Sequence, residues 1–128
     1  MITVKNLYKS FDESVVLNNI STRFENGKTN LIIGQSGSGK TIFMKCILGL
    51  YGINSGEIFF GDKSFQKMNI KERSILRQEI GMVFQGSALF DSMTVEENIM
   101  FPMRMLTKKS FKEMQDRANE VIARVDLI

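Results

Sequence analysis

Histidine is absent from the 128-residue sequence, and cysteine occurs once, as Cys46. Because histidine is the commonest proton shuttle and the commonest transition-metal ligand, its absence excludes the usual forms of both sites. A single cysteine excludes an internal disulfide framework, and its apolar surroundings indicate a small buried side chain rather than a reactive thiol. Chemistry in this chain must therefore rely on other side chains or on the backbone.

Long apolar runs are also lacking. No segment approaches the ~20 apolar residues that a helix needs to cross a bilayer, and residues 1–11 lack the apolar region of a secretion signal. We therefore expect a cytoplasmic protein. The 17 lysines and arginines only slightly outnumber the 14 aspartates and glutamates, and they are scattered. This weak, dispersed charge does not favour nucleic acid as a partner.

The composition is that of one globular domain, with 43% hydrophobic and 24% charged residues. Strand-like segments at residues 2–8, 20–24, 31–33, 57–60 and 80–84 are combined with helix-like segments at 40–50 and 71–78. Alternation in the first segment predicts Asn6 on the face of Val4, and the continuous apolar run 31–33 predicts a strand buried on both faces. Strands that alternate with helices predict an α/β fold.

Two capping boxes predict helix starts in the last third of the chain, Thr94 with Glu97 and Ser110 with Glu113. The first helix should end near Pro102, because proline interrupts helical hydrogen bonds. The second helix carries an apolar stripe, which predicts core packing rather than a groove for a partner. The stripe consists of Phe111, Met114, Ala118, Val121, Ile122 and Val125.

The segment GQSGSGKT carries the clearest chemical signal. It consists of Gly34, Gln35, Ser36, Gly37, Ser38, Gly39, Lys40 and Thr41, and it fits the phosphate-loop pattern G-x-x-x-x-G-K-[ST]. Glycines let the chain wrap with its N–H groups turned inward, and the N-terminus of the following helix adds its dipole. Lys40 would contact the β- and γ-phosphates of a nucleotide, and Thr41 would bind Mg²⁺.

This spacing favours a nucleotide ligand over a flexible loop that merely caps a helix. Two fixed glycines followed by lysine and a hydroxyl residue are rare by chance in a chain of this length, and a strand-like segment leads into the loop. The loop does not identify the reaction, because kinases, GTPases and transport ATPases share it. The Asn-Lys-x-Asp segment with which GTPases read guanine is absent from the sequence.

Further segments resemble the N-terminal part of the nucleotide-binding domain of ABC-type ATPases. They are NLYKSFDESVVLNNISTRFENGK, ILGLYGINSGEIFFGD and IGMVFQ, in the family's order and spacing. The resemblance covers residues 1–128 and implies part of a P-loop NTPase fold of the ABC ATPase type. It adds an N-terminal antiparallel β portion to the phosphate-loop core, and it implies ATP and Mg²⁺ as cofactors.

The resemblance also implies roles for single residues. Phe11 lies where the family places a ring that stacks on adenine, with a hairpin core residue as the alternative and Tyr8 as the less favoured stacking candidate. Gln85 matches the catalytic glutamine that approaches Mg²⁺ and the attacking water. Ile42, at the α-phosphate position, replaces a second hydroxyl residue. A charge-assisted hydrogen bond is worth about 1.5–3 kcal/mol, so weaker nucleotide binding is expected.

The segment FQGSALFDSMTVEENIMFP is similar to the ATPases of the maintenance-of-lipid-asymmetry family, which drive phospholipid movement in Gram-negative envelopes. This similarity implies the ATP-binding subunit of an ABC transporter, working as a homodimer beneath a membrane permease on the cytoplasmic face of the inner membrane. Lipoprotein-release and amino-acid transporters are the alternatives. ABC-type proteins that act on DNA or ribosomes are less favoured, because long heptad arms and tandem cassettes are absent.

Several of the family's segments are absent from these 128 residues: the Leu-Ser-Gly-Gly-Gln signature, the Walker B strand with its acidic pair, and the switch histidine. Because hydrolysis needs these groups, we expect this chain alone to bind ATP with little hydrolysis. A non-hydrolysing, truncated nucleotide-binding module is the alternative to part of a transporter subunit. Without a Walker B strand beside them, residues 31–33 should expose an open edge that invites association with another chain.

Overall fold

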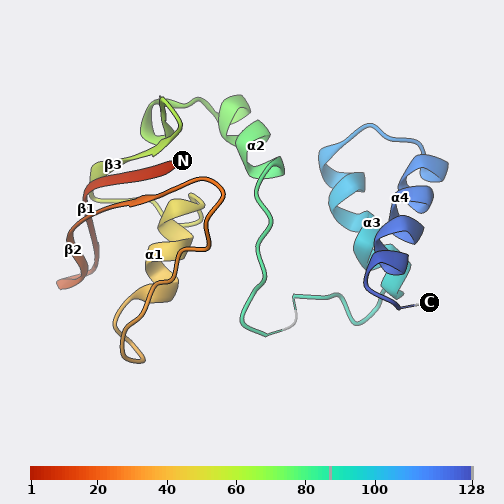
Figure 1. The fold of residues 1–128 in the computed structure, drawn as a ribbon, viewed down its shortest axis with the longest axis horizontal. Helices are drawn as coiled ribbons and strands as arrows, with labels where there is room; N and C mark the ends of the chain where they lie inside the picture. Colours follow the sequence, from red (N-terminus) through yellow and green to blue (C-terminus); the bar gives the residue numbers. More distant parts are fainter. Residues whose placement is uncertain (87, 128) are drawn as a thin grey trace. The chain divides into compact units, whose positions relative to one another are not determined.

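A computed structural model describes residues 1–86 and 88–127. The chain divides into two compact units, Met1–Ile80 and Gly81–Ile128. All strands of the described residues belong to the first unit, and the second unit consists of helices and irregular segments (Figure 1). None of the described helices is both long enough and apolar enough to cross a membrane.

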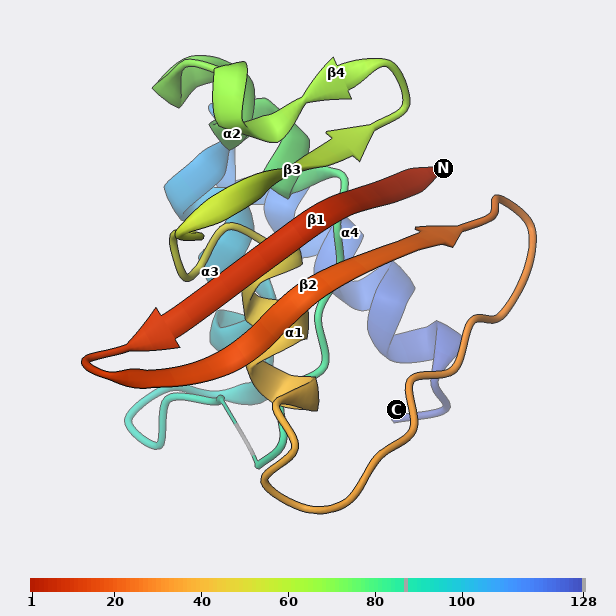
Figure 2. The same ribbon diagram turned by 90° about the vertical axis from the view of Figure 1, so that its left-hand side faces the viewer.

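An antiparallel sheet of four strands, in the order β2-β1-β3-β4, forms the framework of the first unit (Figure 2). The strands are β1 (Ile2–Phe11), β2 (Ser14–Phe24), β3 (Ser55–Phe60) and β4 (Lys63–Ser64). β1 and β2 form a hairpin in which Ile2 lies opposite Phe24 and Phe11 lies opposite Ser14. The antiparallel N-terminal portion expected from the sequence is thereby confirmed.

A bulge in β1 changes which side chains reach the core. The register shifts between Val4 and Leu7, where Asn6 takes a φ of 49°. Val4 and Leu7 are 1% and 0% exposed, so the predicted placement of Asn6 on the face of Val4 is wrong. An extra residue in one strand re-aims the residues that follow it. The Asn6 amide donates to Asn19 Oδ1 at 2.9 Å, which holds the bulge in place.

Helix α1 (Lys40–Ile47) lies against one face of this sheet (Figure 2). The core that results consists of Val4, Leu7, Leu17, Phe43, Cys46, Ile47, Ile58 and Phe65. Cys46 is buried, as predicted. Burial raises the pKa of its thiol, and the nearby ammonium of Lys9 acts in the opposite direction. The sheet and α1 therefore share one continuous core.

Two further helical segments follow β4, η1 (Phe65–Lys67) and α2 (Ile70–Gln78). Arg77 of α2 donates from Nη2 to the Gly49 carbonyl at 3.0 Å and from Nε to the Leu48 carbonyl at 3.4 Å. These carbonyls lie just beyond the last residue of α1, where helical partners run out. Gly49 takes a φ of 72°, the left-handed conformation in which glycine commonly ends a helix, and α1 ends just before it.

Two predicted strands do not form. Residues 31–33 and 80–84 are irregular, and Leu31, Ile33 and Val83 are 83%, 81% and 97% exposed. A buried parallel strand needs hydrogen-bonded neighbours. No strand of the described residues pairs with either segment, so their apolar composition alone does not place them in a sheet. The exposed apolar side chains expected at residues 31–33 are confirmed for Leu31 and Ile33, whereas Ile32 packs against the core.

In the second unit, α3 (Val95–Leu106) and α4 (Phe111–Arg124) begin at the two predicted capping boxes. Thr94 Oγ1 accepts from the Glu97 N–H at 3.1 Å, while Glu97 accepts from the Thr94 N–H at 2.8 Å. Ser110 and Glu113 exchange the corresponding bonds at 3.3 and 2.8 Å. Both predicted helix starts are confirmed.

Helix α3 continues through Pro102 instead of ending there. Proline lacks an N–H, so one helical hydrogen bond is lost at this position. Met100 and Met103, on either side of the proline, pack with Met114 and Ala118 of α4. This packing stabilises the turn that follows Pro102, and the predicted end of the helix is therefore wrong.

The apolar stripe of α4 is buried only in part. Met114 and Ala118 lie in the small core with Met100, as core packing predicts. Phe111 and Val125, at the two ends of the stripe, are exposed. Two helices alone cannot cover a stripe of this length, so the prediction holds for its centre only.

Candidate nucleotide-binding site

The phosphate loop connects the irregular residues 31–33 to the first turn of α1. Ser38 N–H donates to the Gln35 carbonyl at 3.1 Å, which closes the loop on itself. Gly37 and Gly39 take φ angles of 79° and 102°. Glycine adopts such angles without the strain that a Cβ causes, so the glycine pattern matches the shape of the loop. Ser36, near its tip, is exposed.

The start of α1 offers backbone donors to an anion. Gly39 is the N-cap residue, no side chain caps the helix, and its first turn contains no acidic residue. Free N–H groups and the positive end of the helix dipole favour a bound phosphate. A Cβ on Gly39 would lie 3.2 Å from Val16 of β2, so the helix start also packs closely against the sheet.

Lys40 places its ammonium group inside the loop. Its Nζ donates to the carbonyls of Gly34 and Gln35 at 2.6 and 2.7 Å, and it lies 3.4 Å from Ser38 Oγ. None of the ion pairs among the described residues involves Lys40. No carboxylate among these residues balances its charge, so phosphate oxygens would replace the loop carbonyls as its hydrogen-bond partners.

Gly34 lies close to two side chains of the loop. A Cβ at Gly34 would lie 2.7 Å from Ser38 Oγ and 3.7 Å from Lys40 Cδ, so a larger residue would displace the Ser38 hydroxyl. Thr41 is exposed in the first turn of α1, where its hydroxyl is accessible to a metal ion. The side chain of Ile42 instead packs against the core and, unlike a hydroxyl, offers no hydrogen bond to a phosphate. These features fit a nucleotide phosphate.

Mg²⁺ fits this site only together with a nucleotide. Among the described residues, no group of three or more histidine, cysteine, aspartate or glutamate side chains could hold a metal ion. Mg²⁺ commonly binds through few protein ligands, several waters and substrate phosphates. The hydroxyl of Thr41 and the phosphate oxygens would therefore supply the direct ligands from this unit.

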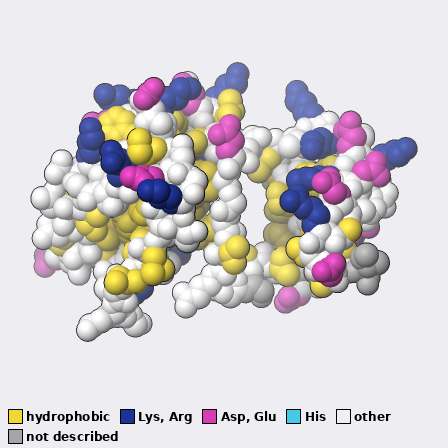
Figure 3. Space-filling view, in the orientation of Figure 1, with side chains coloured by type: hydrophobic (Ala, Val, Ile, Leu, Met, Phe, Trp, Pro, Cys, Tyr) yellow, Lys and Arg dark blue, Asp and Glu magenta, His cyan; other side chains and the backbone are white. Residues whose placement is uncertain are grey.

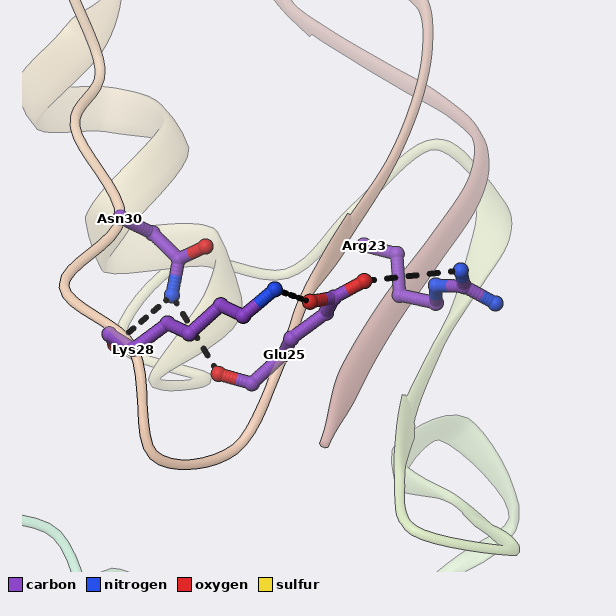
Figure 4. A network of polar contacts seen from close by, with 4 residues as sticks. All are labelled: Arg23, Glu25, Lys28 and Asn30. Carbon is purple, nitrogen blue, oxygen red and sulfur yellow. Dashed lines mark hydrogen bonds and ion pairs between the residues drawn. The ribbon is translucent and has the colours of Figure 1, made fainter.

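A polar network orders the turn that leads from β2 toward the loop (Figure 4). Glu25 pairs with Lys28 at 2.6 Å and with Arg23 at 3.8 Å. The Asn30 amide donates to the carbonyls of Lys28 at 3.2 Å and Glu25 at 3.5 Å. Exposed ion pairs stabilise little by themselves, so the network mainly restricts the conformation of residues 25–30. Basic and acidic side chains are likewise mixed on the face in Figure 3.

Phe11 ends β1 and is not part of the buried core. It is 37% exposed, as is Tyr8, so the interpretation of Phe11 as a core residue is wrong and its stacking on adenine remains a prediction. Lys9 Nζ lies 4.8 Å from the Phe11 ring centroid, and Tyr51 makes an edge contact with the ring. Because residues two positions apart in a strand share a face, the sequence could have placed Lys9 beside Phe11. Tyr51 comes from a distant segment and gave no such signal.

Gln85 belongs to the second unit, where it is exposed and follows the irregular residues 80–84. The structure brings together Lys40, Thr41 and the other residues of the phosphate loop within the first unit, but Gln85 is not among them. Its role at Mg²⁺ and water therefore stays a prediction.

The family model for ABC transporters matches residues 17–128. The chain belongs to the ABC transporter family. A phosphonates import ATP-binding protein of Fusobacterium nucleatum is 40% identical and shares 87% of this chain and 44% of its own length. An L-cystine import ATP-binding protein of Bacillus subtilis is 38% identical over 99% of this chain and 53% of its own length. The chloroplastic protein TRIGALACTOSYLDIACYLGLYCEROL 3 of Arabidopsis thaliana is 33% identical over 99% and 36%.

A solved ATP-binding cassette has the same fold. It is a dimer in a post-hydrolysis state bound to ADP and Pi, and it is 28% identical to this chain with a TM-score of 0.82. The match covers 96% of this chain and 56% of the cassette, which confirms the ABC ATPase type of P-loop fold. This chain thus spans about half the length of the relatives it matches.

Proposed function

We propose that this chain is the N-terminal portion of the ATP-binding subunit of an ABC transporter and that it binds MgATP through residues 34–41. The observation that carries the proposal is the position of the Lys40 ammonium, which lies inside the loop and has no carboxylate partner among the residues that the structure describes. The uncapped start of α1 adds N–H donors beside it. Family membership supports ATP as the nucleotide.

Each predicted residue has a distinct role in this proposal. Backbone N–H groups of the loop hold the phosphates, and Lys40 neutralises their charge. Thr41 binds Mg²⁺, and Phe11 stacks on adenine. Gln85 orients the attacking water, which a neutral amide can do at any pH near neutrality.

Calorimetric titration of the chain with ATP, with and without Mg²⁺, tests the proposal. Lys40→Ala should weaken binding by roughly 10- to 150-fold, since a hydrogen bond to a charged group is worth about 1.5–3 kcal/mol. Lys71→Ala is the matched control, because Lys71 is an exposed lysine in the first turn of α2. Failure of ATP to bind at millimolar concentration, or equal binding by Lys40→Ala, would overturn the proposal.

We further propose that the 128 residues by themselves hydrolyse ATP slowly, because the sequence contains neither the signature segment nor the Walker B acidic pair. Phosphate release by the purified chain should remain near that of a buffer control. Rapid turnover that disappears in Lys40→Ala would contradict this.

Phospholipid is our proposed class of transported molecule, with a partner permease and a second ATP-binding subunit at the cytoplasmic face of the inner membrane. Residues 84–102 support this proposal, because they are similar to the ATPases of the lipid-asymmetry family. The Arabidopsis relative also supports it, because that protein is named after a glycolipid. Amino-acid import is the second candidate, favoured by the L-cystine import relative. Proteoliposomes containing the full-length subunit and its permease should transfer labelled phospholipid in an ATP-dependent way. Uptake of cystine without lipid transfer would favour the second candidate.

A further inference from the structure

Two aromatic rings and two ammonium groups lie together near the end of β1, and none of them belongs to the fully buried core. The ring centroids of Phe11 and Tyr51 are 5.5 Å apart at an interplanar angle of 80°, which is an edge contact. Lys9 Nζ lies 4.8 Å from the Phe11 centroid and 5.9 Å from that of Tyr51. Lys45 Nζ of α1 lies 5.4 Å from the Tyr51 centroid. Tyr51 therefore connects the ring of Phe11 to α1.

Asn54, three positions after Tyr51, holds the backbone just before Phe11. Its Oδ1 accepts from the Ser10 N–H at 2.9 Å, and its own N–H donates to the Tyr8 carbonyl at 2.9 Å. The second bond reaches a residue where the register of β1 against β3 has already shifted. Asn54 thus fixes the backbone of β1 at Tyr8 and Ser10, which sets the position of Phe11.

Residues 51–54 therefore support Phe11 in two ways: the Tyr51 ring contacts its ring, and Asn54 holds the backbone at Tyr8 and Ser10 just before it. They follow α1, whose first residue is Lys40 of the phosphate loop. One short helix consequently connects the phosphate loop at its start to the support of Phe11 beyond its end. Phe11 is 37% exposed, so part of its ring remains available to a flat ligand.

We propose that Tyr51 and Asn54 are positioning residues for the nucleotide base: they hold Phe11 in place for stacking while the loop holds the phosphates. The proposal rests on the proposed function of the phosphate loop. A ring that is already fixed loses little conformational freedom when a base stacks on it, and such preorganisation increases affinity. Without this support, Phe11 would have to be ordered by the ligand.

Comparison of two ligands separates this role from a structural one. MgATP and magnesium tripolyphosphate share the phosphates, but only ATP has a base. Tyr51→Leu should weaken ATP binding about threefold to tenfold and leave tripolyphosphate binding unchanged, as the worth of an aromatic pair indicates. Asn54→Ala should likewise lower the ratio of the affinity for ATP to the affinity for tripolyphosphate. Calorimetry measures both affinities on the complete chain.

Conservative variants serve as matched controls. Tyr51→Phe keeps the ring and Asn54→Asp keeps an oxygen acceptor for the Ser10 N–H, so both should retain the original ratio. Tyr8→Leu removes an equally exposed ring from the same strand and should also retain it. Binding of tripolyphosphate by each variant shows that the loop is folded.

Several results would overturn the inference. They are an unchanged ratio in Tyr51→Leu and Asn54→Ala, a parallel loss of both ligands, and a selective loss of ATP in Tyr8→Leu. The proposed function is tested separately, because it fails if Lys40→Ala leaves tripolyphosphate binding intact. If Tyr51→Leu does not fold, the ratio in Asn54→Ala decides.

Discussion

β1 and residues 31–33 both carry apolar side chains, yet β1 buries two of them fully, while in residues 31–33 only Ile32 packs against the core. Val4 and Leu7 are 1% and 0% exposed, whereas Leu31 and Ile33 are 83% and 81% exposed. β1 has hydrogen-bonded neighbours on both sides, while no strand of the described residues pairs with 31–33. The difference teaches that apolar composition does not suffice to place a strand in a core, because its backbone groups also need partners.

The phosphate loop keeps its form even though the segment before it is unpaired. Local bonds hold it, from Ser38 N–H to the Gln35 carbonyl and from Lys40 to the Gly34 carbonyl. Residues 31–34 and β2 line an open hollow of about 420 Å³ beside it. The shape of the loop therefore depends on its glycines, its lysine and α1, and not on a paired strand that precedes it.

Truncation of one leucine in each region gives the largest expected contrast. Leu7→Ala should lower the free energy of unfolding by about 2–5 kcal/mol, because it leaves a cavity in the core. Leu31→Ala should change it by less than about 0.5 kcal/mol, as exposed positions do. Urea unfolding of both variants measures the difference. Equal losses would show that residues 31–33 are packed as well as β1.

A second contrast concerns glycines at positive φ. Gly56 of β3 takes a φ of 99°, and a Cβ there would lie 2.4 Å from the Asn6 carbonyl oxygen in the bulge of β1. Gly27, with a φ of 70°, has nothing within 4 Å. Gly56→Ala should cost about 1–3 kcal/mol of stability from overpacking, in addition to the backbone strain of about 1–2 kcal/mol that Gly27→Ala also suffers.

Thermal melting of the two glycine variants provides the measurement. The larger loss at Gly56 would confirm that close approach of β3 maintains the bulge that puts Leu7 in the core. Equal melting temperatures for the two variants would contradict the close contact between β1 and β3.

The buried thiol of Cys46 makes the stability of the core between α1 and the sheet depend on pH. Burial raises its pKa above the ordinary value of 9.0, so the folded chain keeps the proton when the unfolded chain loses it. The stability that this neutral thiol contributes is fully present at pH values below the pKa of the unfolded chain. It is lost as the pH rises through the raised pKa of the folded chain. The slope is at most about 1.4 kcal/mol per pH unit. Cys46→Ala should remove this loss, and identical pH profiles for the two proteins would contradict it.

Local sequence signals predicted much of this architecture because they describe interactions within a few residues. The capping boxes at Thr94 and Ser110 formed as expected, and the glycines of the phosphate loop took the angles that their pattern requires. Predictions were wrong where the structure depends on partners that are distant in the sequence. Pro102 remains inside α3 because α4 packs against the residues around it, and the bulge at Asn6 depends on neighbouring strands.

The candidate site divides in the same way. The phosphate side is a continuous segment, so its residues could be named from spacing alone. The base side joins Phe11 to Tyr51 and Asn54, which are far away in the sequence, and only the folded chain brings them together. Gln85 lies in the other unit, and its distance from the loop cannot be predicted from a local sequence pattern.

The smallest expected effect on folding concerns charges on the unpaired segment. Ile33→Lys and Leu31→Lys should each change the free energy of unfolding by less than about 0.5 kcal/mol, since both side chains are already exposed. Their expected effect is on self-association, which an exposed apolar segment promotes and an added charge opposes. Light scattering should show a smaller average mass for these variants than for the original chain. Val15→Lys, at an exposed position of the paired strand β2, should leave the mass unchanged. A monodisperse monomer of the original chain with high thermal stability would contradict the role assigned to residues 31–33.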